Sequence, residues 1–127
     1  MIVEISENSD TTYRLFDWNR GEREMHIEKA LASVNFNDFE PELLRPRGEQ
    51  LIQCPYFTVE KWRLDQPRIA AGGGACAIIF CLSGQVKVAE QRYGCGDFFF
   101  LPACAERTEL EPAAEGTSLL RVRLPSR

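Results

Sequence analysis

The residue types that most often carry metal or redox chemistry are few in this sequence and poorly spaced for it. There is one histidine, His26, and there are five cysteines without a C-x-x-C pair. A structural zinc site needs about four such donors, usually in closely spaced pairs. The sequence therefore predicts no metal site in this chain. The odd cysteine count argues against a disulfide framework, and most cysteines lie in apolar runs, so we expect free, buried thiols.

Composition and charge exclude several functional classes. The chain has 127 residues, of which 44% are hydrophobic and 27% charged, as in an ordinary soluble domain. A net charge of −4 argues against a nucleic-acid surface, which needs clustered basic residues. No apolar run approaches the roughly 20 residues of a membrane span, and no signal-peptide core opens the chain. We expect a cytoplasmic protein that binds neither nucleic acid nor membrane.

The first third of the chain combines two predicted strands with a helix. Residues 2–5 and 13–18 have strand-like patterns, and the polar run at 8–10 between them is typical of a turn. Over residues 23–34 the apolar side chains recur at i, i+3, i+4 and i+7, which predicts a one-faced helix. His26 lies on its opening turn, where packing or capping is the expected role. Pro and Gly residues at 41–48 indicate a connector.

The remainder of the chain predicts a series of short strands. Strand-like runs separated by Gly-containing turns occupy residues 57–64, 75–82, 85–89, 98–101 and 118–124. Strands repeating every 8–12 residues or so, without intervening helices, favour a sandwich or barrel over an α/β fold. The predicted fold class is all-β, a double-sheet jelly roll with one short helix.

Three residues give this strand pattern a more specific meaning. Gly84 is expected to turn a hairpin, Gly96 suits a turn with positive φ, and Pro102, six positions later, can close a strand without donating a hydrogen bond. This arrangement resembles the cupin (RmlC-like) pattern. A metal-binding cupin also needs histidines and a carboxylate, but the matching positions read Ala71–Gly74, Ala77 and Cys104–Arg107. The resemblance therefore implies a metal-free cupin barrel.

The amino-terminal residues resemble one enzyme family. The run N-S-D-T-T-Y-R at residues 8–14, its continuation to Arg20 and the segment 23–31 are similar to the short bacterial class of type I mannose-6-phosphate isomerases. The similarity continues through residues 56–61 and 100–103. The family interconverts mannose 6-phosphate and fructose 6-phosphate, moving a proton between C1 and C2 through an enediol or enediolate. Zinc, held by a preceding barrel, polarises the sugar oxygens.

The resemblance implies roles for four residues. Arg14 matches the family's active-site arginine and is the expected catalytic residue, since a fixed cation stabilises negative charge developing on the intermediate. Asn8, Asp10 and Arg20 are the expected substrate-binding residues, although longer members of the family carry a lysine near Arg20. From the residues alone other readings stay open. Asn8 and Asp10 could only form a turn, and Arg14 could be a surface strand residue.

The resemblance also implies a division of the chain and its partners. Residues 1–48 would be the end of a first, catalytic barrel with its linking helix, and residues 49–127 a metal-free carboxy-terminal barrel. The expected partners are the missing amino-terminal metal-binding barrel, a sugar phosphate in the full-length parent, and a second copy in a homodimer. Because zinc would belong to the parent and not to this chain, we expect the chain alone to be inactive. The alternative is a non-catalytic cupin acting as a sugar-binding or oligomerisation module.

Overall fold

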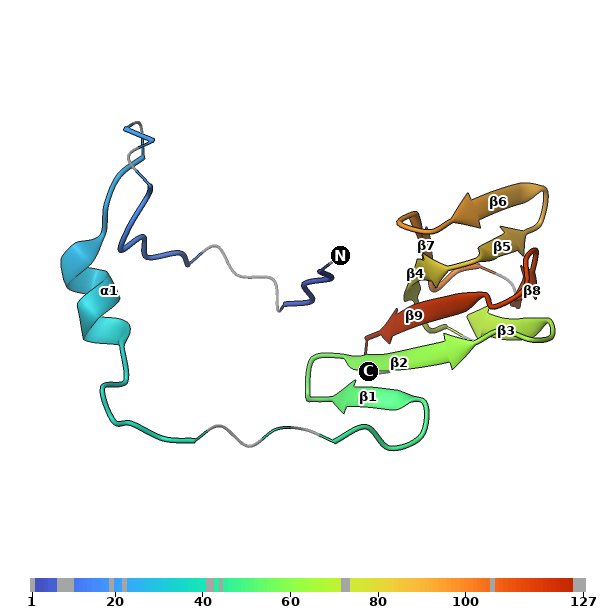
Figure 1. Cartoon of the computed structure of the whole chain (residues 1–127), viewed down its shortest axis with the longest axis horizontal. Coiled ribbons are helices and arrows are strands. Elements are labelled where there is room, and N and C mark those ends of the chain that lie inside the picture. The colour runs from blue at the N-terminus through green and yellow to red at the C-terminus, as the bar shows by residue number, and fades with distance from the viewer. Residues whose placement is uncertain are drawn as a thin grey trace. The chain divides into compact units, whose positions relative to one another are not determined.

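The computed structural model describes residues 2–6, 11–18, 20–21, 23–40, 43, 45–71, 74–105 and 107–124. These fall into two compact units, Met1–Glu42 and Leu43–Arg127. Figure 1 shows a helix in the first unit and the strands in the second. In the described part of the chain no helix is long and apolar enough to cross a membrane. The assignment of residues 1–48 to the end of a preceding barrel stays a prediction.

The helix of the first unit, α1 (Ile27–Ser33), is shorter than the sequence predicts. Its expected start at Arg23 is wrong by four residues. The backbone N–H of His26 donates to the carbonyl of Arg14 at 2.8 Å, and His26 has the non-helical angles φ −117° and ψ 47°. A hydrogen bond to a segment distant in sequence thus holds His26 outside the helix, as its N-cap residue.

The two strands predicted in the first unit are wrong. The described residues of 2–5 and 13–18 have no strand assignment. A strand needs a neighbouring strand that satisfies its backbone groups in a ladder. Among the described residues, the backbone groups of Arg14 exchange hydrogen bonds with His26, which lies before a helix and not in a strand. Trp18 has φ +50°, which is incompatible with a continuing strand.

The second unit is built from nine strands in its described residues. They are β1 (Gln50–Gln53), β2 (Thr58–Arg63), β3 (Arg68–Ala71), β4 (Ala77–Ser83), β5 (Gln85–Val88), β6 (Gln91–Gly94), β7 (Phe98–Leu101), β8 (Thr108–Pro112) and β9 (Ser118–Arg123). They form a five-stranded sheet in the order β1-β2-β9-β4-β7 and a four-stranded sheet in the order β3-β8-β5-β6. Strand pairs in both sheets are antiparallel, and Figure 1 shows β9 between β2 and β4. The predicted all-β, cupin-type jelly roll is confirmed.

Of the nine strands of the second unit, five were predicted from the sequence and four were not. The predicted runs correspond to β2, β4, β5, β7 and β9, and β7 ends at Leu101 immediately before Pro102, as expected. The missed strands are β1, β3, β6 and β8. The sequence T-E-L-E-P of β8 has one fully buried side chain, Leu110. Pairing with β3 and β5 therefore stabilises β8 more than its own composition does.

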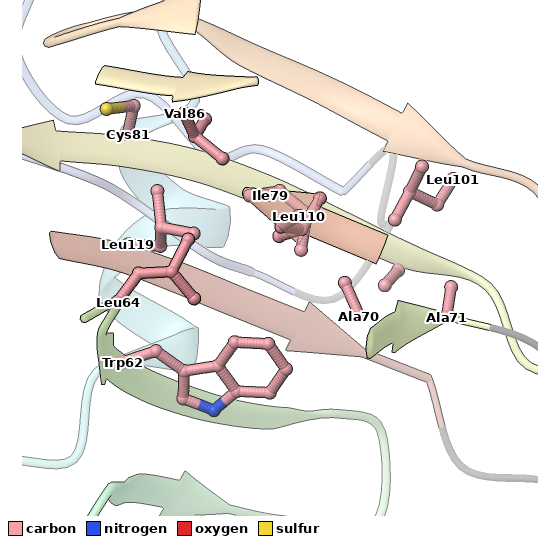
Figure 2. Close-up of a cluster of buried hydrophobic side chains, with 11 residues drawn as sticks. Trp62, Leu64, Ala70, Ala71, Ile79, Cys81, Val86, Leu101, Leu110 and Leu119 are labelled. Atoms are coloured by element: carbon pink, nitrogen blue, oxygen red, sulfur yellow. The ribbon is translucent and has the colours of Figure 1, made fainter. Parts of the chain in front are cut away.

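The core lies between the two sheets. Inward-facing side chains of both sheets meet there, as Figure 2 shows, with Trp62, Leu64 and Leu119 toward one end and Ala71 and Leu101 toward the other. The largest of these side chains are essentially inaccessible to water, and each such burial contributes roughly 1.5–3 kcal/mol. The barrel is therefore filled with packed apolar groups.

Gly84 occupies a corner, and the hairpin expected there is wrong. The strands on either side of it, β4 and β5, belong to different sheets and do not pair with each other. Gly84 has φ +70°, and a Cβ atom on it would lie 2.6 Å from Thr117 Oγ1 and 2.7 Å from Thr117 Cα. Thr117 is fully buried and accepts a hydrogen bond from the backbone N–H of Gln85. Only glycine meets both the conformational and the steric requirement. Gly96, with φ +94°, adopts the positive φ expected of it.

Candidate functional site

Arg14 belongs to a small charged cluster in the first unit. Its Nε lies 3.6 Å from Asp17 Oδ1, and its Nη1 donates to the backbone carbonyl of Glu24 at 3.4 Å. The Arg14 side chain is 27% exposed and that of Asp17 is 13% exposed. These contacts hold the guanidinium in place while part of it stays open to solvent.

His26 contacts this cluster through both its backbone and its imidazole ring. The backbone N–H of Arg14 donates to His26 Nδ1 at 3.3 Å, so Nδ1 is the acceptor nitrogen of the ring in this contact. His26 Nε2 lies 3.7 Å from Glu24 Oε2, and the ring centroid is 6.1 Å from that of Tyr13. The imidazole therefore positions the Arg14 segment against the residues preceding α1.

Sequence reasoning missed two members of the cluster, Asp17 and Arg23. Asp17 Oδ1 lies between two guanidinium groups, since Arg23 Nη1 is 3.9 Å from it. Asp17 Oδ2 is buried and has no hydrogen-bond partner in the described part of the chain. The i, i+3 spacing of Arg14 and Asp17 was the available signal. In the strand expected over residues 13–18, side chains three positions apart would face opposite ways, so that spacing does not predict the contact.

The other predicted site residues are placed differently or not at all. Asn8 and Asp10 lie outside the described residues, so their expected substrate-binding role remains a prediction. Arg20 is exposed, and its backbone N–H donates to the carbonyl of Asp17 at 2.9 Å. The structure thus brings Arg14 together with Asp17, Arg23 and His26, and Arg20 reaches this group through its backbone.

The residues that the structure describes do not fit a zinc ion. Where a metal-binding cupin would have ligands, Ala71 and Ala77 are buried at 4% and 1% exposure. Ala77 pairs with Leu101 on one side and Arg123 on the other. Within the described ranges no three His, Cys, Asp or Glu residues are grouped so that they could hold a metal. The sole histidine, His26, is engaged as described above.

A second charged cluster, also missed from sequence, lies on the inward face of the five-stranded sheet. Arg121 Nη1 donates to Glu60 Oε2 at 2.7 Å and Arg121 Nε donates to the carbonyl of Ala70 at 2.7 Å. The guanidinium carbons of Arg68 and Arg121 lie 3.7 and 4.7 Å from the ring centroid of Trp62. Arg121 thus connects β9 of one sheet to β3 of the other.

Burial and pairing shift the ionisation of this cluster. Burial lowers the pKa of Arg121, and the hydrogen bond to Glu60 opposes that shift. Arg68 donates two hydrogen bonds to Glu49, at 2.7 and 2.8 Å, which holds the pKa of that carboxyl below its ordinary value. The cluster therefore joins β9 to β3 through Arg121 and ties Arg68 of β3 to Glu49, the residue before β1.

The cysteines are free, as expected, but most are not buried. Cys81 is fully buried, Cys54 and Cys76 are partly exposed, and Cys95 and Cys104 are exposed. Burial raises the pKa of the Cys81 thiol, and the neighbouring Cys95 and Asp97 raise it further. The expectation of buried thiols was wrong for most of the cysteines, and the two exposed ones, Cys95 and Cys104, lie in turns and not within strands.

The sequence of this chain is similar to those of known proteins. No family model matches the sequence. The mannose-6-phosphate isomerase ManA of Bacillus subtilis is 30% identical over 132 aligned positions, which cover 91% of this chain and 42% of ManA. The probable mannose-6-phosphate isomerase GmuF of the same organism is 30% identical over 119 positions, covering 81% of this chain and 38% of GmuF.

A solved structure agrees with the sequence relatives. The crystal structure of the mannose 6-phosphate isomerase from Bacillus subtilis superimposes with a TM-score of 0.63 at 23% identity, covering 91% of this chain and 41% of that one. At this identity the superposition supports the fold alone. The chain spans about two fifths of the length of the relatives it matches. The expected resemblance to mannose-6-phosphate isomerases is confirmed by these relatives.

Proposed function

Because the chain is a homologue of Bacillus mannose-6-phosphate isomerases over 81–91% of its own length, we propose that it is the carboxy-terminal part of such an isomerase. The full-length protein would interconvert mannose 6-phosphate and fructose 6-phosphate. The homology, which extends across both units, is the observation that carries the proposal. A cytoplasmic location, where thiols remain reduced, belongs to the same proposal and accords with five free cysteines.

In this proposal Arg14 supplies a positive charge for the reaction. A proton transfer between C1 and C2 of an open-chain sugar leaves negative charge on the adjoining oxygens, and a fixed guanidinium lowers the energy of that state. Arg14 is suited to this because Asp17 and the Glu24 carbonyl restrict its side chain without burying it. Asn8, Asp10 and Arg20 would contact the sugar phosphate from the same segment.

The proposal assigns the zinc ion to the rest of the full-length protein. When bound there, the metal would polarise the sugar oxygens. This chain would contribute Arg14 and its supporting residues, together with the carboxy-terminal barrel. By itself it would be inactive, since the donor set of its described residues does not fit the metal.

Two proteins, the isolated chain and a chimera, are assayed separately to test the proposal. Conversion of mannose 6-phosphate is measured for the 127-residue protein with and without added zinc, and for ManA in which the homologous region is replaced by this chain. We expect no turnover by the isolated chain and zinc-dependent turnover by the chimera. A folded, zinc-loaded chimera without activity would overturn the proposed function, and turnover by the isolated chain would overturn its proposed inactivity.

The role of Arg14 is tested within the chimera. Arg14→Gln is expected to lower kcat by about 10²-fold or more, in the range seen when a stabilising donor is removed. Arg92→Gln is the matched control, because Arg92 lies on β6 of the barrel and its side chain donates to Gln85. Equal activity of the two variants would remove Arg14 from the catalytic site.

A further inference from the structure

Two of the five free cysteines are neighbours in the barrel. Cys81 is near the end of β4, and Cys95 is in the turn between β6 and β7. This turn is hydrogen-bonded directly to Cys81. The backbone N–H of Gly96 donates to the Cys81 carbonyl at 2.9 Å, and the Cys81 N–H donates to the Asp97 carbonyl at 2.9 Å. Cys95 is therefore one position away from a backbone contact with Cys81.

The two thiol groups lie along the same stretch of backbone, where β4 ends. Cys95 Sγ is 3.0 Å from the carbonyl oxygen of Leu82, the residue that follows Cys81. Cys81 Sγ is 3.5 Å from the carbonyl oxygen of Ser83 and 3.8 Å from that of Gly84. Both thiols thus contact a run of three consecutive carbonyls. The electrostatics agree with this proximity, since burial raises the pKa of Cys81 and the neighbouring Cys95 raises it further.

The turn that carries Cys95 is built to adjust. The backbone N–H of Asp97 donates to the Gly94 carbonyl at 3.0 Å, which closes a four-residue turn. Cys95 lies in it between Gly94 and Gly96, and no atom lies within 4 Å of the position that a Cβ on Gly96 would occupy. A disulfide joins Cα atoms about 4.4–6.8 Å apart. Rotation about two glycines lets Cys95 meet that requirement without displacing β6 or β7.

The two thiols differ in their access to solvent. Cys95 is exposed and Cys81 is fully buried. An oxidant in solution therefore reaches Cys95 first, and Cys81 reacts with a group that the barrel itself brings to it. An accessible thiol with a second thiol beside it is the arrangement found in redox-sensing cysteine pairs.

We propose that Cys95 and Cys81 are a peroxide-sensitive pair that forms a reversible disulfide within one chain. In the first step the Cys95 sulfur attacks an oxygen of hydrogen peroxide, the O–O bond breaks, and Cys95 becomes a sulfenic acid as one water leaves. In the second step the Cys81 sulfur attacks the Cys95 sulfur, the S–O bond breaks, and the Cys81 proton leaves with the hydroxyl group as a second water. Both cysteines are oxidised and the peroxide is reduced. A thiol reductant reverses the reaction by exchange.

The disulfide attaches the turn between β6 and β7 covalently to β4, next to the corner at Gly84. It closes the loop 81–95, which restricts the unfolded chain and so favours the folded one. In the cytoplasm such bonds are transient and serve catalysis or redox sensing, which accords with free thiols in the resting protein. This inference concerns the barrel alone and does not depend on the isomerase activity proposed above.

Oxidation of the folded, reduced chain with stoichiometric hydrogen peroxide tests the proposal. The remaining thiols are alkylated in denaturant and the protein is analysed by mass spectrometry. We expect the chain to remain a single copy of 14.5 kDa with three of its five cysteines alkylated. Trypsin releases Cys81 in the peptide 69–87 and Cys95 in the peptide 93–107, and the two peptides should be found linked. Dithiothreitol should restore all five thiols.

Cys104→Ser is the matched control for Cys95→Ser, because both cysteines are exposed and lie in the same tryptic peptide. Cys104→Ser should form the disulfide like the wild type, and Cys95→Ser should leave Cys81 reduced at the same dose of peroxide. Circular dichroism of the wild type should be unchanged by oxidation, because the bond forms within the native fold.

Three results would overturn the proposal. The first is a linked peptide in which fragmentation finds Cys76 or Cys104 in place of the proposed pair. The second is oxidation of Cys95 to a sulfinic acid while Cys81 stays reduced, since that is the fate of a thiol without a partner. The third is loss of the native circular dichroism spectrum when the disulfide forms.

Discussion

Arg121 and Glu60 are register partners on β9 and β2, and they share a hydrogen bond of 2.7 Å on the inward face of the sheet. Their side chains are 13% and 19% exposed, so the pair is largely withdrawn from water. The carboxylate has a second cation nearby, because Arg123 Nε lies 3.8 Å away. A pair of this kind is costly to break by removing one partner, since the other charge then remains buried.

Replacing Arg121 with alanine should destabilise the barrel by about 2–3 kcal/mol. This is below the roughly 3–5 kcal/mol typical of a fully buried pair, because both side chains keep some contact with water. Urea unfolding followed by tryptophan fluorescence measures the change, since Trp62 stacks on Arg121. Arg92→Ala, on the exposed strand β6, is the control and should change stability by less than about 0.5 kcal/mol.

A double-mutant cycle isolates the Glu60–Arg121 contact from the loss of packing. Glu60→Gln and Arg121→Ala, alone and together, should give a coupling energy of about 1 kcal/mol or more, as residues in one ion-pair network do. Additive effects of the two substitutions would show that Arg121 stabilises the barrel through its hydrogen bond to Ala70 and its stacking on Trp62, and not through Glu60.

Gly84→Ala should destabilise the barrel far more than Gly48→Ala. Both glycines have positive φ, +70° and +61°, so each substitution carries roughly 1–2 kcal/mol of backbone strain. At Gly84 the new methyl group also meets the backbone of Thr117, whereas at Gly48 no atom lies within 4 Å. Overpacking adds about 1–3 kcal/mol at Gly84. Thermal unfolding of both variants checks the difference, and equal midpoints would contradict the corner geometry.

The Glu49–Arg68 pair should stabilise the fold at neutral pH and lose its effect in acid. The folded-state pKa of Glu49 is lowered by its hydrogen bonds from Arg68. A carboxyl with a lowered pKa stabilises the folded state above its unfolded pKa, and this contribution is lost as the pH falls through the folded pKa. Unfolding of the wild type and Glu49→Gln should therefore differ at pH 7 and converge below about pH 4. A difference that persists in acid would mean that Glu49 acts by packing.

Thiol alkylation should distinguish Cys81 from Cys95. The thiolate is the reactive form, and burial raises the pKa of Cys81 while keeping it from reagent. Cys95 is exposed, although its Sγ lies 3.0 Å from the carbonyl of Leu82. Iodoacetamide followed by mass spectrometry should label Cys95 in the native protein and Cys81 only after unfolding. Equal labelling rates in the native state would contradict the burial of Cys81.

Apolar runs and turn-forming glycines predicted some of the strands and turns correctly. The apolar runs of β4, β7 and β9 and the turn at Gly96 were found because their composition and backbone requirements do not depend on distant partners. The same signals failed for residues 13–18, where alternation and aromatic residues suggested a strand. There the backbone of Arg14 pairs with His26, and in the part of the chain that the structure describes no strand ladder includes residues 13–18.

The sequence by itself determined the fold class, the family resemblance and Arg14 as the expected catalytic residue. Tertiary structure alone decided which charged groups meet. Glu60 and Arg121 are 61 positions apart, and only the pairing of β2 with β9 makes them neighbours. Asp17 likewise joins Arg14 and Arg23 because the chain folds back at His26. Register and chain reversal arise from the whole pattern of contacts, so a local reading of residues cannot supply them.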